Sequence, residues 1–292
     1  MTIKQFFRIV EIRTKLVSFS TLLLAFIYSY CATGHLDLLW ALVVFLASLF
    51  IDMGTTAFNT FFDFDNRTDS KGTNREADKV LVHEGVPSGY ALVTAIVLSV
   101  LGGGIGIALA FKFGPLMLLF GILSLAAGFL YSGGPLPISR TPFGELFAGG
   151  FLGTVLFFVV CLSQGVELGW AAFLASVPSL VHIAAILTVN NTCDIEGDKV
   201  AGRKTISILL GPGASKIFLG VEIFLVWVFV LLTNEVTVPT VALVVFGLLG
   251  SAVGLSRMFA RGLSHETKGP SMGGISRIFL LFTVVYAAVL AF

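Results

Sequence analysis

Two clusters of carboxylate and carboxamide side chains stand out in a chain with few charged residues. In the first cluster, Asn59 and Asp63 are four residues apart, so that one face of a helix can present both side chains. In the second cluster, Asn190, Asp194 and Asp198 follow one another at intervals of four, which predicts a stripe along one helical face. The same Asn-x-x-x-Asp spacing therefore occurs twice and offers oxygen ligands at both places.

Carboxylates that are held close together need a cation. Two like charges about 4 Å apart repel each other by roughly 4 kcal/mol at an effective dielectric constant of 20. Oxygen ligands from Asp and Asn suit Mg²⁺, which uses one or two carboxylates and takes its other ligands from water and substrate phosphates. Two such clusters facing each other predict a diphosphate held between Mg²⁺ ions. Basic side chains that could bind the remaining phosphate oxygens are Arg67, Arg75, Lys79, Lys199, Arg203 and Lys204. For four other acids, solvated loop charge is the simpler interpretation: Asp65, Glu76, Asp78 and Glu196.

The elements that must position these clusters are membrane helices. Of the 292 residues, 56% are hydrophobic and 12% are charged, whereas about 25% are charged in ordinary soluble domains. So few charged residues cannot cover the surface of a soluble protein. This composition excludes a soluble enzyme, a disordered chain and a disulfide scaffold. It predicts an all-α, polytopic integral membrane protein.

The hydropathy pattern predicts about nine transmembrane helices. A helix needs roughly 17–25 residues to cross about 30 Å of hydrocarbon. The two clusters lie at the ends of the second and sixth spans, four spans apart. This interval indicates two four-helix units plus one helix in a single domain over residues 1–292. The predicted spans are 16–34, 37–61, 88–111, 114–131, 142–164, 168–191, 212–232, 236–257 and 276–292.

The basic residues predict the orientation of the chain. With these spans, every Lys and Arg except Lys112 falls on the side of the membrane that carries the two clusters. The positive-inside rule makes that side cytoplasmic. We therefore expect a multi-pass protein of the cell (inner) membrane, with its N-terminus and its active-site cavity on the cytoplasmic side.

A cation-coupled transporter is the alternative from another functional class. Transporters also repeat helix bundles and carry acidic residues in the membrane, but they place ionisable groups near the midplane. Here the acids lie at the ends of spans beside basic loops, which favours phosphate chemistry.

At this point the chain resembles the UbiA superfamily of intramembrane prenyltransferases. The stretch from Asp194 to Gly211, DIEGDKVAGRKTISILLG, is similar to the second Asp motif of that family, and Asn59, Asp63 and Asp69 resemble the first. Two further stretches match its loop between spans 4 and 5 and its N-terminal basic motif. These stretches are YSGGPLP from Tyr131 with TPFGE from Thr141, and Arg13-Thr-Lys15.

The first motif departs from the family pattern in a way that points to one branch. The usual motif has Asp at offsets 1, 4 and 8 from Asn, whereas this chain has Thr60 and Arg67 at offsets 1 and 8 and Asp69 at offset 10. That spacing and the Tyr-Ser-Gly-Gly-Pro loop are similar to the MenA branch, the 1,4-dihydroxy-2-naphthoate polyprenyltransferases of menaquinone synthesis. Either Asp65 or Asp69 is then the third acid of the motif.

The resemblance implies a reaction, a cofactor and partners. It implies Mg²⁺-dependent transfer of a polyprenyl group from polyprenyl diphosphate to 1,4-dihydroxy-2-naphthoate, with loss of CO₂ to give demethylmenaquinone. The acceptor could instead be 4-hydroxybenzoate or homogentisate. The partners are these two substrates and the lipid bilayer, with no role for nucleic acid.

The resemblance also implies roles for particular residues. Tyr131 would join the basic residues in binding the diphosphate, and Arg13 would hold the carboxylate of the acceptor. The implied catalytic residues are Asn59, Asp63, Asp69, Asn190, Asp194 and Asp198, and all of these except Asn190 are expected to hold the metal.

Among the ionisable residues inside predicted spans, Asp52, His182 and Glu222 are not part of these motifs, and we assign no role to Glu222. Asp52 lies seven residues before Asn59, on nearly the same helical face and about 10 Å deeper. An acid at that depth is a candidate functional residue, so Asp52 either lines the cavity that binds the acceptor or the lipid, or is a protonated packing residue. For His182 in the sixth span, we favour a hydrogen bond between helices over a catalytic role.

Overall fold

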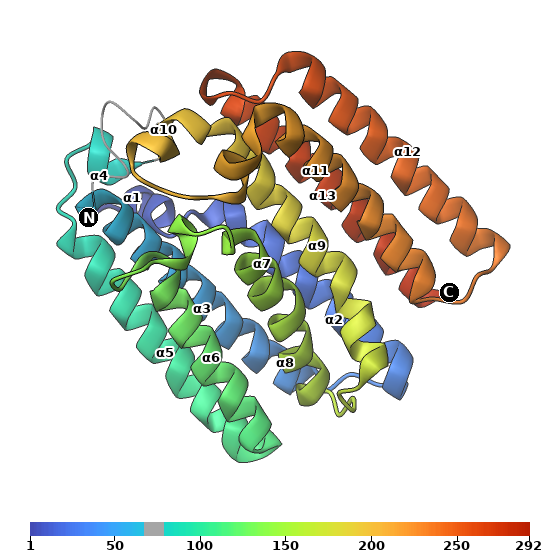
Figure 1. Ribbon diagram of the computed structural model, residues 1–292. Coiled ribbons are helices and arrows are strands. Elements are labelled where there is room, and N and C mark those ends of the chain that lie inside the picture. Colours follow the sequence, from blue (N-terminus) through green and yellow to red (C-terminus); the bar gives the residue numbers. More distant parts are fainter. Residues whose placement is uncertain (67–78) are drawn as a thin grey trace.

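All regular elements in the described part of the chain are helices (Figure 1). The computed structural model describes residues 1–66 and 79–292. The predicted site residues Arg67 and Asp69, and Arg75, lie outside these residues. The predicted all-α class is therefore confirmed for the residues that the structure describes.

Nine helices of the described residues are long and apolar enough to cross a membrane, as the hydropathy pattern predicts. Three of them are composite: a short 3₁₀ turn (Ile12–Lys15) precedes α2, a π-helical turn (Gly150–Val155) joins α7 to α8, and a 3₁₀ turn (His265–Thr267) precedes α13. The long helices are α2 (Leu16–Thr33), α3 (Leu38–Asp65), α5 (Gly89–Phe113), α6 (Pro115–Ser132), α7 (Gly144–Gly149) with α8 (Leu156–Ser163), α9 (Trp170–Cys193), α11 (Ile206–Leu232), α12 (Val238–Arg261) and α13 (Lys268–Ala291).

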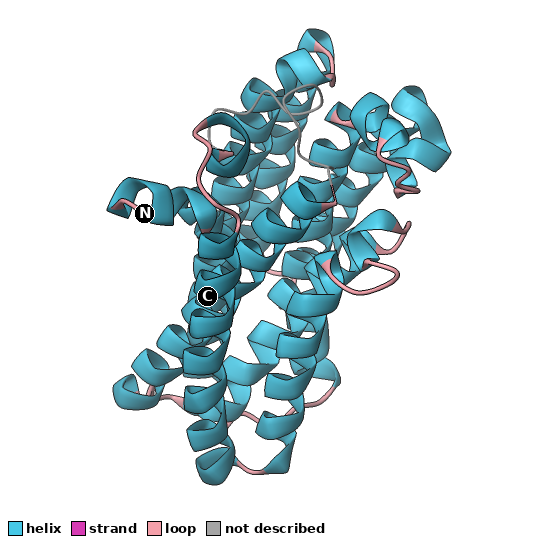
Figure 2. Cartoon of the chain, turned by 90° about the vertical axis from the view of Figure 1, so that its left-hand side faces the viewer, coloured by secondary structure: helices cyan, strands magenta, loops and turns pink. Residues whose placement is uncertain are grey.

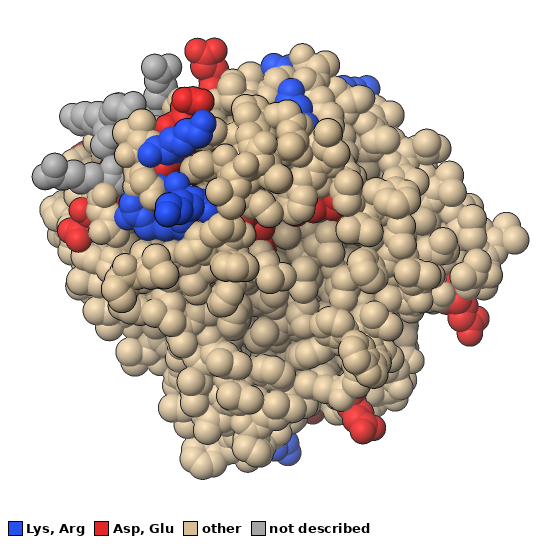
Figure 3. Space-filling view, in the orientation of Figure 1, with Lys and Arg blue, Asp and Glu red and all other residues tan. Residues whose placement is uncertain are grey.

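Three short helices, α1 (Ile3–Ile9), α4 (Val80–His83) and α10 (Ile195–Val200), lie at one end of the long ones. Figure 2 shows α1 at an angle to the long helices, which run side by side. The charged residues visible in Figure 3 lie mainly near the ends of the helices, with a broad uncharged band between them. Such a band is what a hydrocarbon environment requires.

Two helices begin earlier than predicted. The helix α11 begins at Ile206 rather than at residue 212, because the Gly211–Pro212 pair forms a kink inside it (Gly211 φ 77°) instead of a loop before it. The Thr205 side chain caps this helix by accepting a hydrogen bond from the backbone N–H of Ile208. The helix α13 begins at Lys268 rather than at residue 276. Its first turns are helical, but they are too polar for hydropathy to identify them as part of a membrane span.

Helices that are near one another in the chain pack together, and the last long helix also packs on the first. The helices α3, α5 and α6 pack on one another, and α9 packs on α7 and α11. The last helix, α13, contacts α12, α9 and α2, so the ninth span joins the two ends of the bundle. The N-terminal and C-terminal halves thus meet around a shared interior.

His182 makes no hydrogen bond to the described residues, so the predicted hydrogen bond between helices is wrong for that part of the chain. Both ring nitrogens of His182 are buried without a hydrogen-bond partner in the described part of the chain. The ring packs instead against Phe279 and Phe282 of α13, with ring centroids 5.0 and 4.9 Å away. His182 therefore contributes to the contact between α9 and α13 as an aromatic side chain.

Close contact between α7 and α9 depends on a glycine, which allows a test of the packing. A Cβ atom at Gly149 would lie 2.3 Å from the backbone oxygen of Leu180, whereas one at Gly150 would meet nothing within 4 Å. Because the obstacle is backbone, we expect Gly149→Ala to destabilise the purified protein by about 1–3 kcal/mol. Gly150→Ala is the matched control and should leave stability unchanged or raise it by up to about 1 kcal/mol. Equal melting temperatures for the two variants in detergent would contradict this packing.

Candidate active site

A cavity of about 440 Å³ lies among the helices and brings the two polar clusters together. At its polar end it is lined by Asn59 and Asp63 of α3, by Asn190 of α9, and by Asp194 and Asp198 next to it. The remaining wall is largely apolar. Its apolar lining includes Leu109, Met117, Phe147, Phe151, Leu152, Leu156, Val159, Ile183, Ile186 and Leu187.

Arg203 connects the two clusters. One of its terminal nitrogens donates to Asp63 Oδ1 at 3.0 Å, and the other lies 3.3 Å from Asp198 Oδ1. The chain reaches this position through a left-handed turn at Gly202 (φ 71°), where the backbone N–H of Arg203 donates to the carbonyl oxygen of Asp198. A single guanidinium group therefore holds one carboxylate from each cluster.

Asp194 is paired with the beginning of the last span. Lys268 Nζ donates to Asp194 Oδ2 at 2.5 Å, and His265 Nδ1 lies 3.3 Å from Oδ1. Both residues line the cavity. Neither residue belongs to a predicted motif, and the only sign of them in the sequence is a polar segment before a hydrophobic span.

The predicted stripe of Asn190, Asp194 and Asp198 on one continuous helix is wrong. The helix α9 ends at Cys193, Asp194 has φ −102° and ψ 8°, and a separate short helix, α10, follows. This break redirects the chain so that Asp198 is 5% exposed and faces Arg203. The second cluster therefore reaches the cavity through a bend in the chain.

The environment of Asp198 perturbs its ionisation. Burial raises the pKa of Asp198 to about 6, an effect that the charge of Arg203 opposes and that of Asp194 reinforces. The Oδ2 atom of Asp198 is buried and accepts no hydrogen bond within the described residues. Buried carboxylate oxygens ordinarily have a partner, which a bound cation would supply here.

The oxygen donors around the cavity fit Mg²⁺ that arrives together with a phosphate ligand. Among the residues that the structure describes, no three His, Cys, Asp or Glu side chains come close enough to hold a metal ion by themselves. Mg²⁺ does not need such a cage, because water and substrate phosphates complete its shell. Asp63, Asp194 and Asp198 supply carboxylate oxygens, and Asp198 Oδ2 has no hydrogen-bond partner among the described residues.

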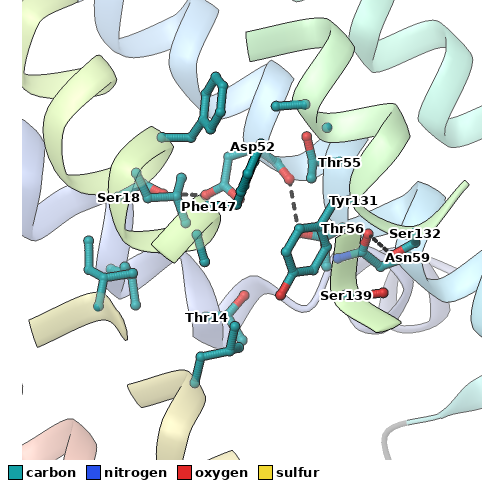
Figure 4. A pocket seen from close by; sticks show the side chains of 18 of the residues that line it. Thr14, Ser18, Asp52, Thr55, Thr56, Asn59, Tyr131, Ser132, Ser139 and Phe147 are labelled. Carbon is teal, nitrogen blue, oxygen red and sulfur yellow. Dashed lines mark hydrogen bonds between the residues drawn. The ribbon is translucent and has the colours of Figure 1, made fainter. Parts of the chain in front are cut away.

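Tyr131 and Ser132 at the end of α6 complete the wall beside the first cluster (Figure 4). Ser132 Oγ donates to Asn59 Oδ1 at 2.6 Å, which fixes the orientation of the carboxamide. Tyr131 lines the same cavity. The YSGGPLP stretch therefore contributes directly to the wall of the site.

The remaining predicted site residues divide into two groups. Lys79 lines the cavity and pairs with Glu11 at 3.0 Å, and Asp52 lines the cavity at greater depth. Other predicted residues have exposed side chains and are not among the lining residues of the described part: Arg13, Lys199 and Lys204. Asp65 and Glu196 are exposed as well.

A buried acid, Glu145, binds the residue that follows Asn190 of the second cluster. Glu145 Oε1 accepts a hydrogen bond of 2.8 Å from Asn191 Nδ2, which ties α7 to α9. Glu145 is 5% exposed, and Asn191 lines the cavity next to Asn190. Glu145 belongs to the TPFGE stretch, and this motif is the feature of the sequence that could have indicated its place near the site.

The chain matches known proteins over most of its length. Residues 18–290 match the model of the UbiA prenyltransferase family. The chain is 34% identical over 179 residues to the 1,4-dihydroxy-2-naphthoate octaprenyltransferase of Bacillus subtilis, which is 60% of this chain and 56% of that protein. It is 28% identical over 221 residues to the UbiA prenyltransferase domain-containing protein 1 of Danio rerio, which is 72% of this chain and 62% of that protein. The chain thus matches less than two thirds of the length of these relatives.

Solved structures share the fold. The structure of a UbiA homolog from Archaeoglobus fulgidus bound to DMAPP and Mg²⁺ aligns with a TM-score of 0.69 and 18% identity, covering 98% of this chain and 99% of that one. A structure of digeranylgeranylglyceryl phosphate synthase aligns with a TM-score of 0.67 and 15% identity, covering 99% and 98%. At these identities the likeness is one of fold.

Proposed function

The chain belongs to the UbiA prenyltransferase family, and from that premise we propose that it transfers a polyprenyl group from a polyprenyl diphosphate to an aromatic acceptor. We propose 1,4-dihydroxy-2-naphthoate as the acceptor, because a relative at 34% identity is named for that substrate. The proposal extends the activity of relatives that this chain matches over part of their length.

One observation carries the proposal, which is that two Asn/Asp clusters and Arg203 meet at the polar end of a mostly apolar cavity. A polyprenyl diphosphate has the same division, with a highly charged head and a long apolar tail. The carboxylates suit a Mg²⁺-bound diphosphate, and the apolar wall suits the prenyl chain. A transporter for a small cation would not need the apolar part.

The residues of the polar end have distinct proposed roles. Mg²⁺ bound between the clusters would supply positive charge that stabilises the leaving diphosphate. Asp63, Asp194 and Asp198 would hold the metal, with Asn59 and Asn190 beside them. Proposed contacts of the diphosphate oxygens are Arg203, Lys79 and Tyr131, which line the cavity, together with the predicted residue Arg67.

The proposed transfer needs no reagent besides the two substrates. The bond between C1 of the prenyl chain and the diphosphate oxygen breaks, and its electron pair leaves with the diphosphate. A bond forms between C1 and the ring carbon that carries the carboxylate of the acceptor. The carboxylate then leaves as CO₂, and its bonding pair returns to the ring. The protein contributes by orienting the two substrates and by stabilising the charge of the leaving group.

We also propose that the polar end faces the cytoplasm. Lys112 lies in the last turn of α5, at the end opposite to the clusters, whereas the predicted spans assign the other Lys and Arg to the side of the clusters. This asymmetry is what the positive-inside rule requires for that side.

A product assay tests the proposed reaction. Membranes that contain the protein are incubated with Mg²⁺, a polyprenyl diphosphate and, in separate reactions, 1,4-dihydroxy-2-naphthoate, 4-hydroxybenzoate or homogentisate. We expect a prenylated product from the dihydroxynaphthoate with the mass that corresponds to loss of CO₂. EDTA should abolish its formation, and excess Mg²⁺ should restore it. Product from another acid alone would replace the acceptor, and no product from any acid would overturn the proposed transfer.

A further inference from the structure

A buried ion pair between Lys15 and Asp52 lies beside the cavity, away from its polar end. Lys15, at the start of the first span, donates from Nζ to Asp52 Oδ1 at 2.6 Å. The same ammonium group donates to Thr56 Oγ1 at 2.5 Å and to the backbone oxygen of Asp52 at 3.3 Å, so all three of its protons have acceptors. Ser18 Oγ donates to Asp52 Oδ2 (Figure 4).

Only the acidic member of this pair faces the cavity. Asp52 and Ser18 are among the lining residues, whereas Lys15 is not, and the Lys15 residue is 1% exposed. Each carboxylate oxygen of Asp52 accepts one side-chain hydrogen bond, and such an oxygen can accept two. The cavity wall therefore presents a carboxylate that is fixed in position and can accept hydrogen bonds from a ligand.

An ion pair at this depth is poorly explained by stability alone. Removing two charges from water is costly, and apolar side chains of similar volume often stabilise a protein equally well. Asp52 lies two helical turns from Asn59, about 10 Å along α3. That distance separates Asp52 from the diphosphate end but keeps it within the same cavity.

The free acceptor positions of Asp52 restrict what can bind there. A diphosphate or the carboxylate of an aromatic acid has no proton to donate to them, and an apolar prenyl chain would leave them unused. A neutral hydrogen-bond donor fits, and the proposed acceptor has two hydroxyl groups. The hydroxyl at C1 can donate to the neighbouring carboxylate of the acceptor itself, whereas the hydroxyl at C4 points across the ring and is free to donate elsewhere.

We infer that Asp52 accepts a hydrogen bond from the C4 hydroxyl of a dihydroxy aromatic acid and thereby selects it over monohydroxy acids. This inference rests on the proposed function, because it requires an aromatic acceptor in the cavity. Asp52 touches the acceptor, and Lys15 and Ser18 are positioning residues that hold its carboxylate. The acceptor then lies with its own carboxylate directed away from Asp52.

The test compares two acids that differ in this hydroxyl. Binding of 1,4-dihydroxy-2-naphthoate and of 1-hydroxy-2-naphthoate to the purified full-length protein is measured by calorimetry without a prenyl donor. We expect the wild-type protein to bind the dihydroxy acid about 10- to 100-fold more tightly, the range of a hydrogen bond to a charged group. Equal affinities in the wild-type protein would overturn the inference, whichever variants fold.

A charge-neutral variant assigns the preference to the ion pair. Lys15→Met combined with Asp52→Leu removes both charges together, so that neither is left buried and unpaired. We expect this double variant to bind the two acids with affinities within about 3-fold of each other, because it lacks the acceptor group. Ser48→Ala removes another cavity-lining hydroxyl four residues away and should keep the wild-type ratio. An unchanged ratio in the double variant would overturn the role of Asp52.

Transfer assays separate this inference from the proposed function. Asp52→Asn should raise the KM for the dihydroxy acid by about 10-fold or more while leaving the KM for the prenyl diphosphate within about 2-fold. If the wild-type protein transfers no prenyl group to any acid, the proposed function fails, and the binding ratio still decides the inference. If transfer occurs but the two acids bind equally, only the inference fails.

Discussion

Replacing Asp63 or Asp194 by asparagine is expected to lower the rate of prenyl transfer roughly 100- to 1,000-fold, as is typical when one charge-stabilising group is removed from an active site. Each substitution keeps the size of the side chain and removes one negative charge from one cluster. Because Mg²⁺ binds through one or two carboxylates, either loss should weaken the metal and the diphosphate together. Turnover of the purified variants at several Mg²⁺ concentrations measures the effect.

The same segment offers a matched control. Glu196 lies between Asp194 and Asp198 but is exposed and is not among the lining residues of the described part. Glu196→Gln should therefore retain turnover within about 2-fold of wild type, as expected of a surface substitution. Turnover near the wild-type level from Asp63→Asn or Asp194→Asn, in protein that inserts and purifies normally, would refute the two-cluster arrangement.

The arrangement of the spans could be predicted because lipid imposes a simple rule on sequence. Every backbone polar group in the hydrocarbon must be paired within a helix, so long apolar segments are sufficient to locate the spans. The ends of the helices follow other rules. Gly211 and Pro212 kink a helix rather than interrupt it, and Lys268 begins a helix that extends beyond its apolar segment.

The composition of the site could be predicted in part, and its internal pairing could not. Repeated spacing identified Asn59, Asp63 and Asp194 as a polar group at one depth, and the cavity brings them together. The partners of Asp194 follow it by more than 70 residues, so that only the packing of α13 against α9 reveals them. Lys15 belongs to the basic motif Arg13-Thr-Lys15, but nothing in its spacing predicts a buried ion pair with Asp52.

The position of Arg203 suggests how the site tolerates its own charge before substrate binds. Asp63 and Asp198 come from opposite halves of the chain, and the guanidinium group between them offsets part of their combined negative charge. If a Mg²⁺-bound diphosphate enters, the metal can take over the carboxylates, and Arg203 can turn its donors to the phosphate oxygens. Arginine suits this exchange because its planar group can bind either partner with two parallel hydrogen bonds.

Removing Arg203 should therefore affect stability and catalysis in different ways. We expect Arg203→Gln to destabilise the substrate-free protein in EDTA by about 1–3 kcal/mol, because it removes the guanidinium group that pairs with two partly buried carboxylates. Mg²⁺ should then raise the melting temperature of this variant more than that of the wild-type protein, since the metal replaces the missing positive charge. Prenyl transfer should fall about 100-fold, with a higher KM for the prenyl diphosphate.

Arg261 provides the control for charge alone, because it is an exposed arginine at the end of α12. Arg261→Gln should change neither the melting temperature in EDTA nor its response to Mg²⁺. The comparison also separates two accounts of Arg203. If Arg203 only binds phosphate, its loss would reduce transfer and leave the Mg²⁺ response of the melting temperature equal to that of wild type. An increased response, observed without any substrate, would require that the guanidinium and the metal compete for the same pair of carboxylates.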